Sequence, residues 1–248
     1  MKLIATNIKN TLVDDQNHFD YQKFQKIMDQ MKSKGIHFVV ISSDNYPHLL
    51  RFFNSIDGQI SFVCENGAQV VKNGVVLKNH LVDYLTCQRV FKYLSKDDQL
   101  FGANIILSGK NNAYTNLKAS DPKFKQQKQF YDYLQHVPDI TAVFDQIYRI
   151  HLEWQSGDDA TRIQLINHHF PDLRAVSNIN GGIDIITEDS SREDGLKALQ
   201  ASFKVNDAEV AILSSDDNDQ NFLNQFSNGI STKNQSIDGL DQINQLIK

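Results

Sequence analysis

Residues 24–41, which read FQKIMDQMKSKGIHFVVI, decide the fold. Apolar side chains recur at helical spacing as far as Met31, and Gly35 is the residue type that most often follows a helix end. Residues 36–41 are a short apolar run rich in Val and Ile, as buried strands are, and a similar run occupies residues 2–6. Strand, helix, glycine and strand form a βαβ unit. The sequence therefore predicts two parallel strands with a helix packed on their sheet.

The segments that follow extend this unit. A second helix is expected at residues 46–54 and a third buried strand at residues 60–64. Asn73-Gly74 then separates two β-rich runs, residues 69–71 and 75–77. Asn-Gly between two such runs is the strongest short-range signal of a hairpin, so an antiparallel hairpin should follow the parallel strands.

The middle of the chain, residues 83–185, changes character because helical segments alternate there with short strands. Trp154 closes one of these strands and is expected to pack in a core rather than to line a substrate entrance. The pattern predicts a separate α+β module, with helices around residues 90–94, 130–134 and 159–170 and strands at residues 103–107, 147–154 and 183–186.

The C-terminal part returns to the first pattern, with a helix at residues 192–203, a buried strand at 208–213 and further helices at 221–226 and 240–247. The outer parts of the chain therefore predict one discontinuous α/β core domain with a parallel sheet, residues 1–82 and 186–248. The α+β module of residues 83–185 is inserted into it as a cap domain.

Composition excludes several classes of protein. The chain has 248 residues, of which 40% are hydrophobic, and a formal net charge of −5 without a basic block, so a nucleic-acid partner is not expected. No run of apolar residues is long enough to span a membrane, and polar residues come too early for a signal peptide. Cys64 and Cys87 lie in unrelated contexts and are expected to be buried thiols. We expect a soluble cytoplasmic protein.

Polar loops follow three of the predicted strands, at residues 7–11, 42–45 and 214–219. In an open parallel sheet these loops meet at the carboxyl ends of the strands, where ligands bind, and the helix start at Arg192 should lie beside them.

The stretch Phe62-Val63-Cys64-Glu65-Asn66-Gly67-Ala68 resembles the flap entry of Cof-type sugar-phosphate phosphatases in the haloacid dehalogenase (HAD) superfamily. With the inserted cap, the resemblance extends over essentially the whole chain. It implies a HAD-like Rossmannoid core, Mg²⁺ as cofactor and hydrolysis of small phosphorylated metabolites.

The first motif departs from the pattern that this resemblance implies. The family has a nucleophilic Asp and, two positions on, an Asp that acts as acid and base. Asn7 and Lys9 stand at these catalytic positions, and Asn10 replaces a turn glycine. Because phosphoryl transfer through an aspartyl-phosphate needs a carboxylate, the resemblance implies that this machinery is disabled.

The other motifs are partly kept. By the resemblance, Thr11, Ser43, Arg192 and Asn218 would bind phosphate, with Arg192 where the family has Lys. Asp219 and Asp216 would be the remaining metal ligands, since Ser215 replaces another family Asp. Mg²⁺ binding is therefore expected to be weak or absent.

Three functions remain open at this point. The leading one is a HAD homologue whose phosphatase activity is lost or very weak. Its pocket would either bind phosphate or a phosphorylated metabolite or be a decayed pocket that binds neither. The second is an active Mg²⁺-dependent phosphatase with rearranged acids. The third is a protein–protein interaction module that uses the cap surface.

Overall fold

The computed structural model describes residues 1–9, 11–13, 18–178, 181–215, 219–232 and 239–248. The chain divides into two compact units. The first comprises Met1–Ser42, Leu50–Lys78 and Arg192–Lys248, and the second comprises Ser43–Leu49 and Asn79–Ser191.

The first unit is built on a seven-stranded sheet with the order β13-β12-β1-β2-β3-β4-β5. Neighbouring strands from β13 to β3 pair in parallel, and β4 pairs antiparallel to β3. This arrangement confirms the predicted α/β fold with a parallel sheet. The strands are β1 (Leu3–Thr6), β2 (His37–Ile41), β3 (Ile60–Cys64), β4 (Gln69–Lys72), β5 (Val75–Asn79), β12 (Val210–Ser214) and β13 (Gly229–Ser231).

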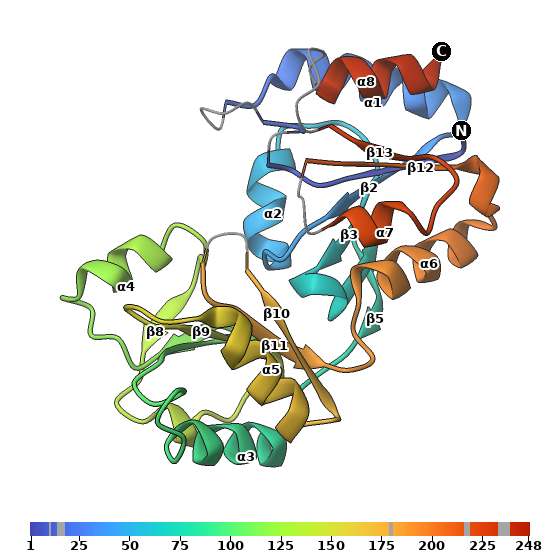
Figure 1. The fold of residues 1–248 in the computed structure, drawn as a ribbon. Helices are drawn as coiled ribbons and strands as arrows, with labels where there is room; N and C mark the ends of the chain where they lie inside the picture. The colour runs from blue at the N-terminus through green and yellow to red at the C-terminus, as the bar shows by residue number, and fades with distance from the viewer. Residues whose placement is uncertain (10, 14–17, 179–180, 216–218, 233–238) are drawn as a thin grey trace. The chain divides into compact units, whose positions relative to one another are not determined.

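Helices cover both faces of this sheet (Figure 1). They are α1 (Tyr21–Lys34), α6 (Arg192–Phe203), α7 (Gln220–Leu223) and α8 (Gly239–Ile247), and α2 (Tyr46–Phe53) has residues in both units. The side chain of Asp20 caps the start of α1, and Gly35 ends it with a φ of 66°. On the other face, a Cβ at Gly195 of α6 would lie 2.5 Å from Val63 of β3. Glycine at this position therefore lets helix and sheet pack closely.

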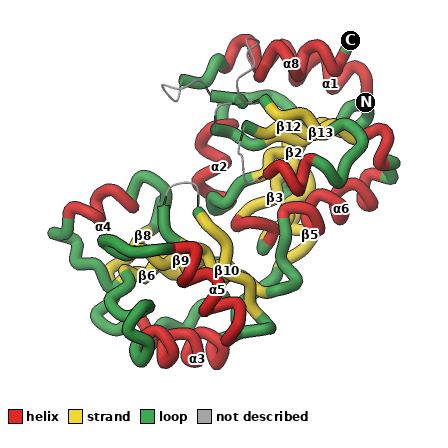
Figure 2. Tube along the Cα trace, viewed as in Figure 1, coloured by secondary structure: helices red, strands yellow, loops and turns green. Residues whose placement is uncertain are grey.

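The second unit is a six-stranded sheet with the order β10-β11-β9-β6-β7-β8, shown in yellow in Figure 2. Its paired strands are antiparallel apart from β7 and β8, which are parallel. The strands are β6 (Asn104–Gly109), β7 (Ala113–Thr115), β8 (Leu134–His136), β9 (Ile147–Glu153), β10 (Leu173–Ser177) and β11 (Ile183–Thr187), and the helices are α3 (Tyr84–Leu94), α4 (Pro122–Gln127) and α5 (Asp159–His169).

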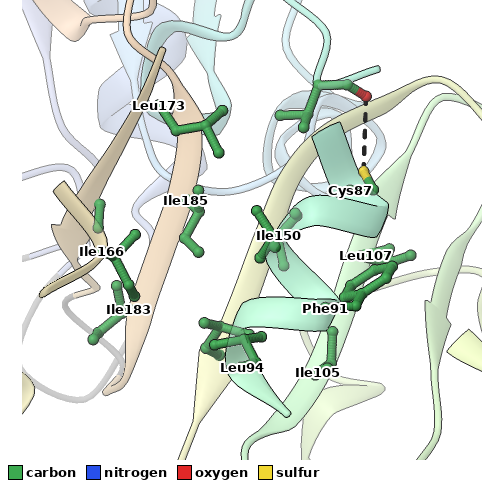
Figure 3. Close-up of a cluster of buried hydrophobic side chains, with 14 of the residues drawn as sticks. Cys87, Phe91, Leu94, Ile105, Leu107, Ile150, Ile166, Leu173, Ile183 and Ile185 are labelled. Carbon is green, nitrogen blue, oxygen red and sulfur yellow. Dashed lines mark hydrogen bonds between the residues drawn. The ribbon is translucent and has the colours of Figure 1, made fainter. Parts of the chain in front are cut away.

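Helices α3 and α5 bury the apolar face of this sheet. Figure 3 shows Phe91 and Leu94 of α3 facing Ile150 of β9, with Ile166 of α5 beside β11. The thiol of Cys87 lies in the same cluster and donates to the carbonyl of Val82 at 3.9 Å. Both cysteines are buried and free, as predicted.

The predicted helix at residues 130–134 is wrong. The helix in this region is α4, which the side chain of Asp121 caps and which begins with Pro122. Tyr131 and Leu134 nevertheless pack with Phe124 in a small apolar cluster, so their helix-like spacing came from burial in a turn and a strand. The short strands β7, β8, β10 and β13 were not predicted. None of the helices in the described ranges is long and apolar enough to cross a membrane.

Candidate active site in the first unit

The candidate site lies at the carboxyl ends of β1 and β12, which pair in parallel with Thr6 opposite Leu213. Asn7 follows β1, and Ser214 is the last residue of β12. The start of α6 and the loop before α7 supply Arg192 and Asp219. The fold thus gathers these polar residues, which are far apart in the sequence, in one place.

The side-chain amide of Asn7 is hydrogen-bonded at both ends. Its nitrogen donates to the hydroxyl of Ser214 at 2.9 Å, and its oxygen accepts from the hydroxyl of Thr11 at 2.7 Å. The hydroxyl of Thr11 also lies 3.3 Å from that of Thr232. The Asn7 amide is therefore a fixed link between two loops.

The hydrogen-bond network continues from Ser214 to Asp219. Its hydroxyl donates to one carboxylate oxygen of Asp219 at 2.6 Å, and the guanidinium of Arg192 donates to the other at 2.5 Å. The Asp219 side chain is buried, whereas that of Arg192 is 24% exposed. Both oxygens of Asp219 are thus engaged, and its charge is matched by that of Arg192.

Asn66 completes the network. Its side-chain oxygen accepts from Nε and a terminal nitrogen of Arg192, at 3.2 and 3.1 Å. Glu65, Asn66 and Gly67 form a tight turn in which all three have positive φ, at 52°, 56° and 100°. A left-handed conformation is unfavourable for Glu and tolerated by Asn and Gly. Backbone strain of this kind clusters at functional sites. In this turn, the side chain of Asn66 contacts the guanidinium of Arg192.

Lys9 and Ser215 make a separate link. The hydroxyl of Ser215 donates to the backbone carbonyl of Lys9 at 2.7 Å. The Lys9 side chain is exposed. Ser215 therefore holds the loop after β1 to the loop after β12.

The remaining predicted residues stand outside this network. Ser43 is buried two residues beyond β2 and is grouped with the second unit. Asn10, Asp216 and Asn218 lie outside the described residues. Sequence reasoning missed Asn66, Ser214 and Thr232 as site residues. The available signals were the polar end of a buried strand for Ser214 and the flap motif for Asn66.

The described residues do not fit the Mg²⁺ that the family implies. Mg²⁺ takes oxygen ligands in near-octahedral geometry, usually including carboxylates. Asp219 supplies the carboxylate of the described network, and both of its oxygens are already hydrogen-bonded, one of them to a cation. The oxygen of Asn7 accepts from Thr11. Within the described ranges, no cluster of His, Cys, Asp and Glu could hold a metal ion.

Comparison with known proteins agrees with this fold. A model of the haloacid dehalogenase-like hydrolase family matches residues 4–243. The chain is 30% identical to the 5-amino-6-(5-phospho-D-ribitylamino)uracil phosphatase YbjI of Escherichia coli (strain K12), over 94% of this chain and 86% of that protein.

Solved structures show the same fold at lower identity. SMU.1108c from Streptococcus mutans UA159 is 22% identical, with a TM-score of 0.86 over 99% of this chain and 91% of that chain. BT1666 from Bacteroides thetaiotaomicron, described among phosphatases of the HAD superfamily, is 16% identical, with a TM-score of 0.76 over 99% and 87%. The match over nearly the whole chain shows that this protein belongs to the haloacid dehalogenase-like hydrolase family, as a Cof-type member.

Proposed function

We propose that this protein binds the phosphate group of a small metabolite and that its phosphatase activity is lost or very weak. The observation that carries the proposal is the Asn7 amide, held between Thr11 and Ser214 where the family has its nucleophile. An amide is a poor nucleophile, and in this position both of its ends are committed to hydrogen bonds. Formation of an aspartyl-phosphate requires a carboxylate.

Lys9 stands where the family has its acid/base aspartate, so the proton transfers of the reaction are lost as well. The acid/base group of the family protonates the leaving alcohol and then accepts a proton from the attacking water, tasks for which a carboxyl group has a suitable pKa. A lysine ammonium in an exposed position does not replace it. The ammonium also repels a divalent cation, so we infer that Mg²⁺ binding is weak or absent.

The same substitutions favour an anion. Lys9, Arg192 and Asp219 together bring two cations and one anion to the carboxyl ends of the strands. A guanidinium has five N–H donors, and Arg192 uses three of them on Asn66 and Asp219. No acceptor among the described residues takes the other two, so they remain for a phosphate oxygen, whereas the hydroxyl hydrogen of Thr11 is already donated to Asn7.

The relative in Escherichia coli suggests which ligands to try. Its name gives 5-amino-6-(5-phospho-D-ribitylamino)uracil as the compound that it dephosphorylates. We propose a ligand of the same kind, a phosphate ester on a short polyol chain. The alternative of an active phosphatase with rearranged acids needs Asp219 and either Asp216 or Asp217 as metal ligands, and Asp216 and Asp217 lie outside the described residues.

Two measurements test the proposal. Hydrolysis of p-nitrophenyl phosphate and acetyl phosphate with Mg²⁺ is compared between the wild type and the triple variant Asn7→Asp, Lys9→Asp, Ser215→Asp. Wild-type turnover above about 1 s⁻¹, the low end for enzymes, contradicts the loss of activity. Calorimetry with phosphate and the phosphoribityl compound tests binding, and the absence of heat at millimolar ligand contradicts it.

A further inference from the structure

A pocket in the second unit is not part of the site described above. It has a volume of about 460 Å³ and lies between the loop after α3 and the loop that joins β9 to α5. The lining residues that bear on its chemistry are Asp98, Phe101, Trp154, Gly157, Asp158 and Arg162.

Arg162 fixes the two loops against each other. Its guanidinium donates to the carbonyl of Gln99 at 3.0 Å and to that of Ser156 at 2.8 Å, and the side chain is buried. The indole of Trp154 adds a third link, donating to the carbonyl of Leu100 at 3.1 Å. Gly157 has a φ of 119°, and a Cβ there would lie 2.2 Å from the guanidinium of Arg162. The pocket is therefore preformed, as small-molecule sites usually are.

Two aromatic side chains form its apolar surface. Phe101 is 69% exposed, although a phenylalanine normally gains free energy from burial. Trp154 is partly buried, and the guanidinium of Arg162 lies 4.2 Å from the centre of its ring. The face of an aromatic ring attracts cations, and the indole of Trp154 already contacts one, the guanidinium of Arg162.

The charge of the lining is negative. Asp98 is exposed, and Asp158 is fixed by hydrogen bonds from Thr161 and from the backbone of Ala160, which lower the pKa of its carboxyl group. The positive charge of Arg162 is matched by Asp159, which pairs with it at 3.1 Å. The carboxylates of Asp98 and Asp158 therefore give a negative charge to a lining that also contains two aromatic rings.

We propose that this pocket binds a small organic ammonium ion, with its apolar groups on Phe101 and Trp154 and its charge near Asp98 and Asp158. Aromatic rings combined with carboxylates favour this class over a neutral or anionic ligand. The proposal does not depend on the phosphate site of the first unit.

Trp154 is the chain's single tryptophan, so its fluorescence reports on the pocket directly. The full-length protein is titrated with tetramethylammonium chloride at constant ionic strength, against sodium chloride and the neutral tert-butanol. We expect a saturable change in emission with the ammonium ion alone. Phe101→Ala and Asp98→Asn should each weaken the apparent affinity about fivefold, in line with a cation–π contact or a partly exposed charge pair.

Phe144→Ala is the matched control, because Phe144 is 80% exposed in the same unit and does not line this pocket. It should leave the affinity unchanged, and circular dichroism should show all three variants folded, since the altered side chains are exposed. No saturable change up to about 50 mM, well beyond a millimolar Kd, overturns the proposal. The same follows if sodium chloride or tert-butanol gives the response, or if Phe101→Ala and Asp98→Asn both titrate like the wild type.

Discussion

The side-chain amide of Asn7 donates to the hydroxyl of Ser214 at 2.9 Å, and that hydroxyl donates to Asp219 at 2.6 Å. The direction of this chain is fixed, because a serine hydroxyl has one hydrogen and Asp219 receives it. Residue 7 must therefore donate a hydrogen bond to Ser214. The amide of asparagine can donate one and a carboxylate cannot, so Asn7 fits the site as a structural residue.

Asn7→Asp alone should destabilise the protein and leave it inactive. The new carboxylate would compete with Asp219 for one hydroxyl hydrogen and lose the bond that Asn7 donates, at a cost of about 1–3 kcal/mol. Urea unfolding followed by circular dichroism measures this cost, and Asn224→Asp, at the exposed end of α7, is the control that should change little. A single variant that is as stable as the wild type and hydrolyses p-nitrophenyl phosphate would show that the network does not constrain residue 7.

Arg192→Lys should weaken phosphate binding although the charge is kept. The planar guanidinium of Arg192 donates to Asn66 and Asp219 and still has donors for an anion. The single ammonium group of a lysine cannot make all of these contacts at once. We expect an increase in Kd of about tenfold by calorimetry, corresponding to one charge-assisted hydrogen bond. Lys197→Gln on the same helix removes an exposed charge that pairs with Glu193, and it should leave the Kd unchanged. Equal affinities for the wild type and Arg192→Lys would place the phosphate elsewhere.

The periodicity of the sequence predicted the elements that bury one regular face. Helix α6 begins and ends where it was expected, and β3 does too, because their apolar residues follow the period of helix and strand. The error at residues 130–134 shows the limit of this signal, since Tyr131 and Leu134 are buried without being helical. The spacing of apolar residues indicates which side chains are buried. Whether the backbone there is helical has to be decided from the length of the segment and from its capping residues.

The candidate site was predictable in its position and less so in its contacts. The rule that ligands bind at the carboxyl ends of parallel strands predicts the region that contains Asn7, Arg192 and Asp219 from the sequence. The bond between Arg192 and Asn66 joins residues 126 positions apart and depends on a left-handed turn that no periodic pattern encodes. Such contacts arise from the tertiary fold, so they became visible only in the structure.

Neither thiol should react in the folded protein. Burial and the nearby charge of Asp83 raise the pKa of the Cys87 thiol to about 12, and Cys64 is fully buried in β3. Because the thiolate is the reactive form, Ellman's reagent at pH 8 should detect almost no thiol in the native protein and both thiols in guanidinium chloride. Rapid reaction of one thiol without denaturant would mean that its unit opens locally. Cys87→Ala would then identify which unit it is.

Asp184 should make the second unit sensitive to acid. The carboxylate is fully buried and accepts from Arg149 at 2.7 Å, His151 at 2.9 Å and Asn178 at 2.8 Å. Burial alone would raise the pKa of Asp184, but the charge of Arg149 and the contacts with His151 outweigh it, so the pKa lies below its usual range. The folded state therefore binds the proton less readily than the unfolded state, where the pKa is about 3.9. The stabilisation is complete above that value and is lost as pH falls from there through the lower pKa of the folded state.

Thermal unfolding between pH 7 and about pH 2 measures this effect against Asp184→Asn, because the loss extends below the unfolded-state pKa. The variant should be less stable at pH 7 by about 3–5 kcal/mol, because Arg149 stays buried without its counter-charge. It should also lose less stability than the wild type on acidification, since the titrating group is gone.

If Asp184→Asn does not fold, Asn178→Ala removes one donor and should shift the acid transition to higher pH. The exposed pair of Arg89 and Asp172 serves as the control, and Asp172→Asn should leave the acid profile nearly unchanged. Parallel acid profiles for the wild type and Asp184→Asn would assign the acid sensitivity to other carboxylates.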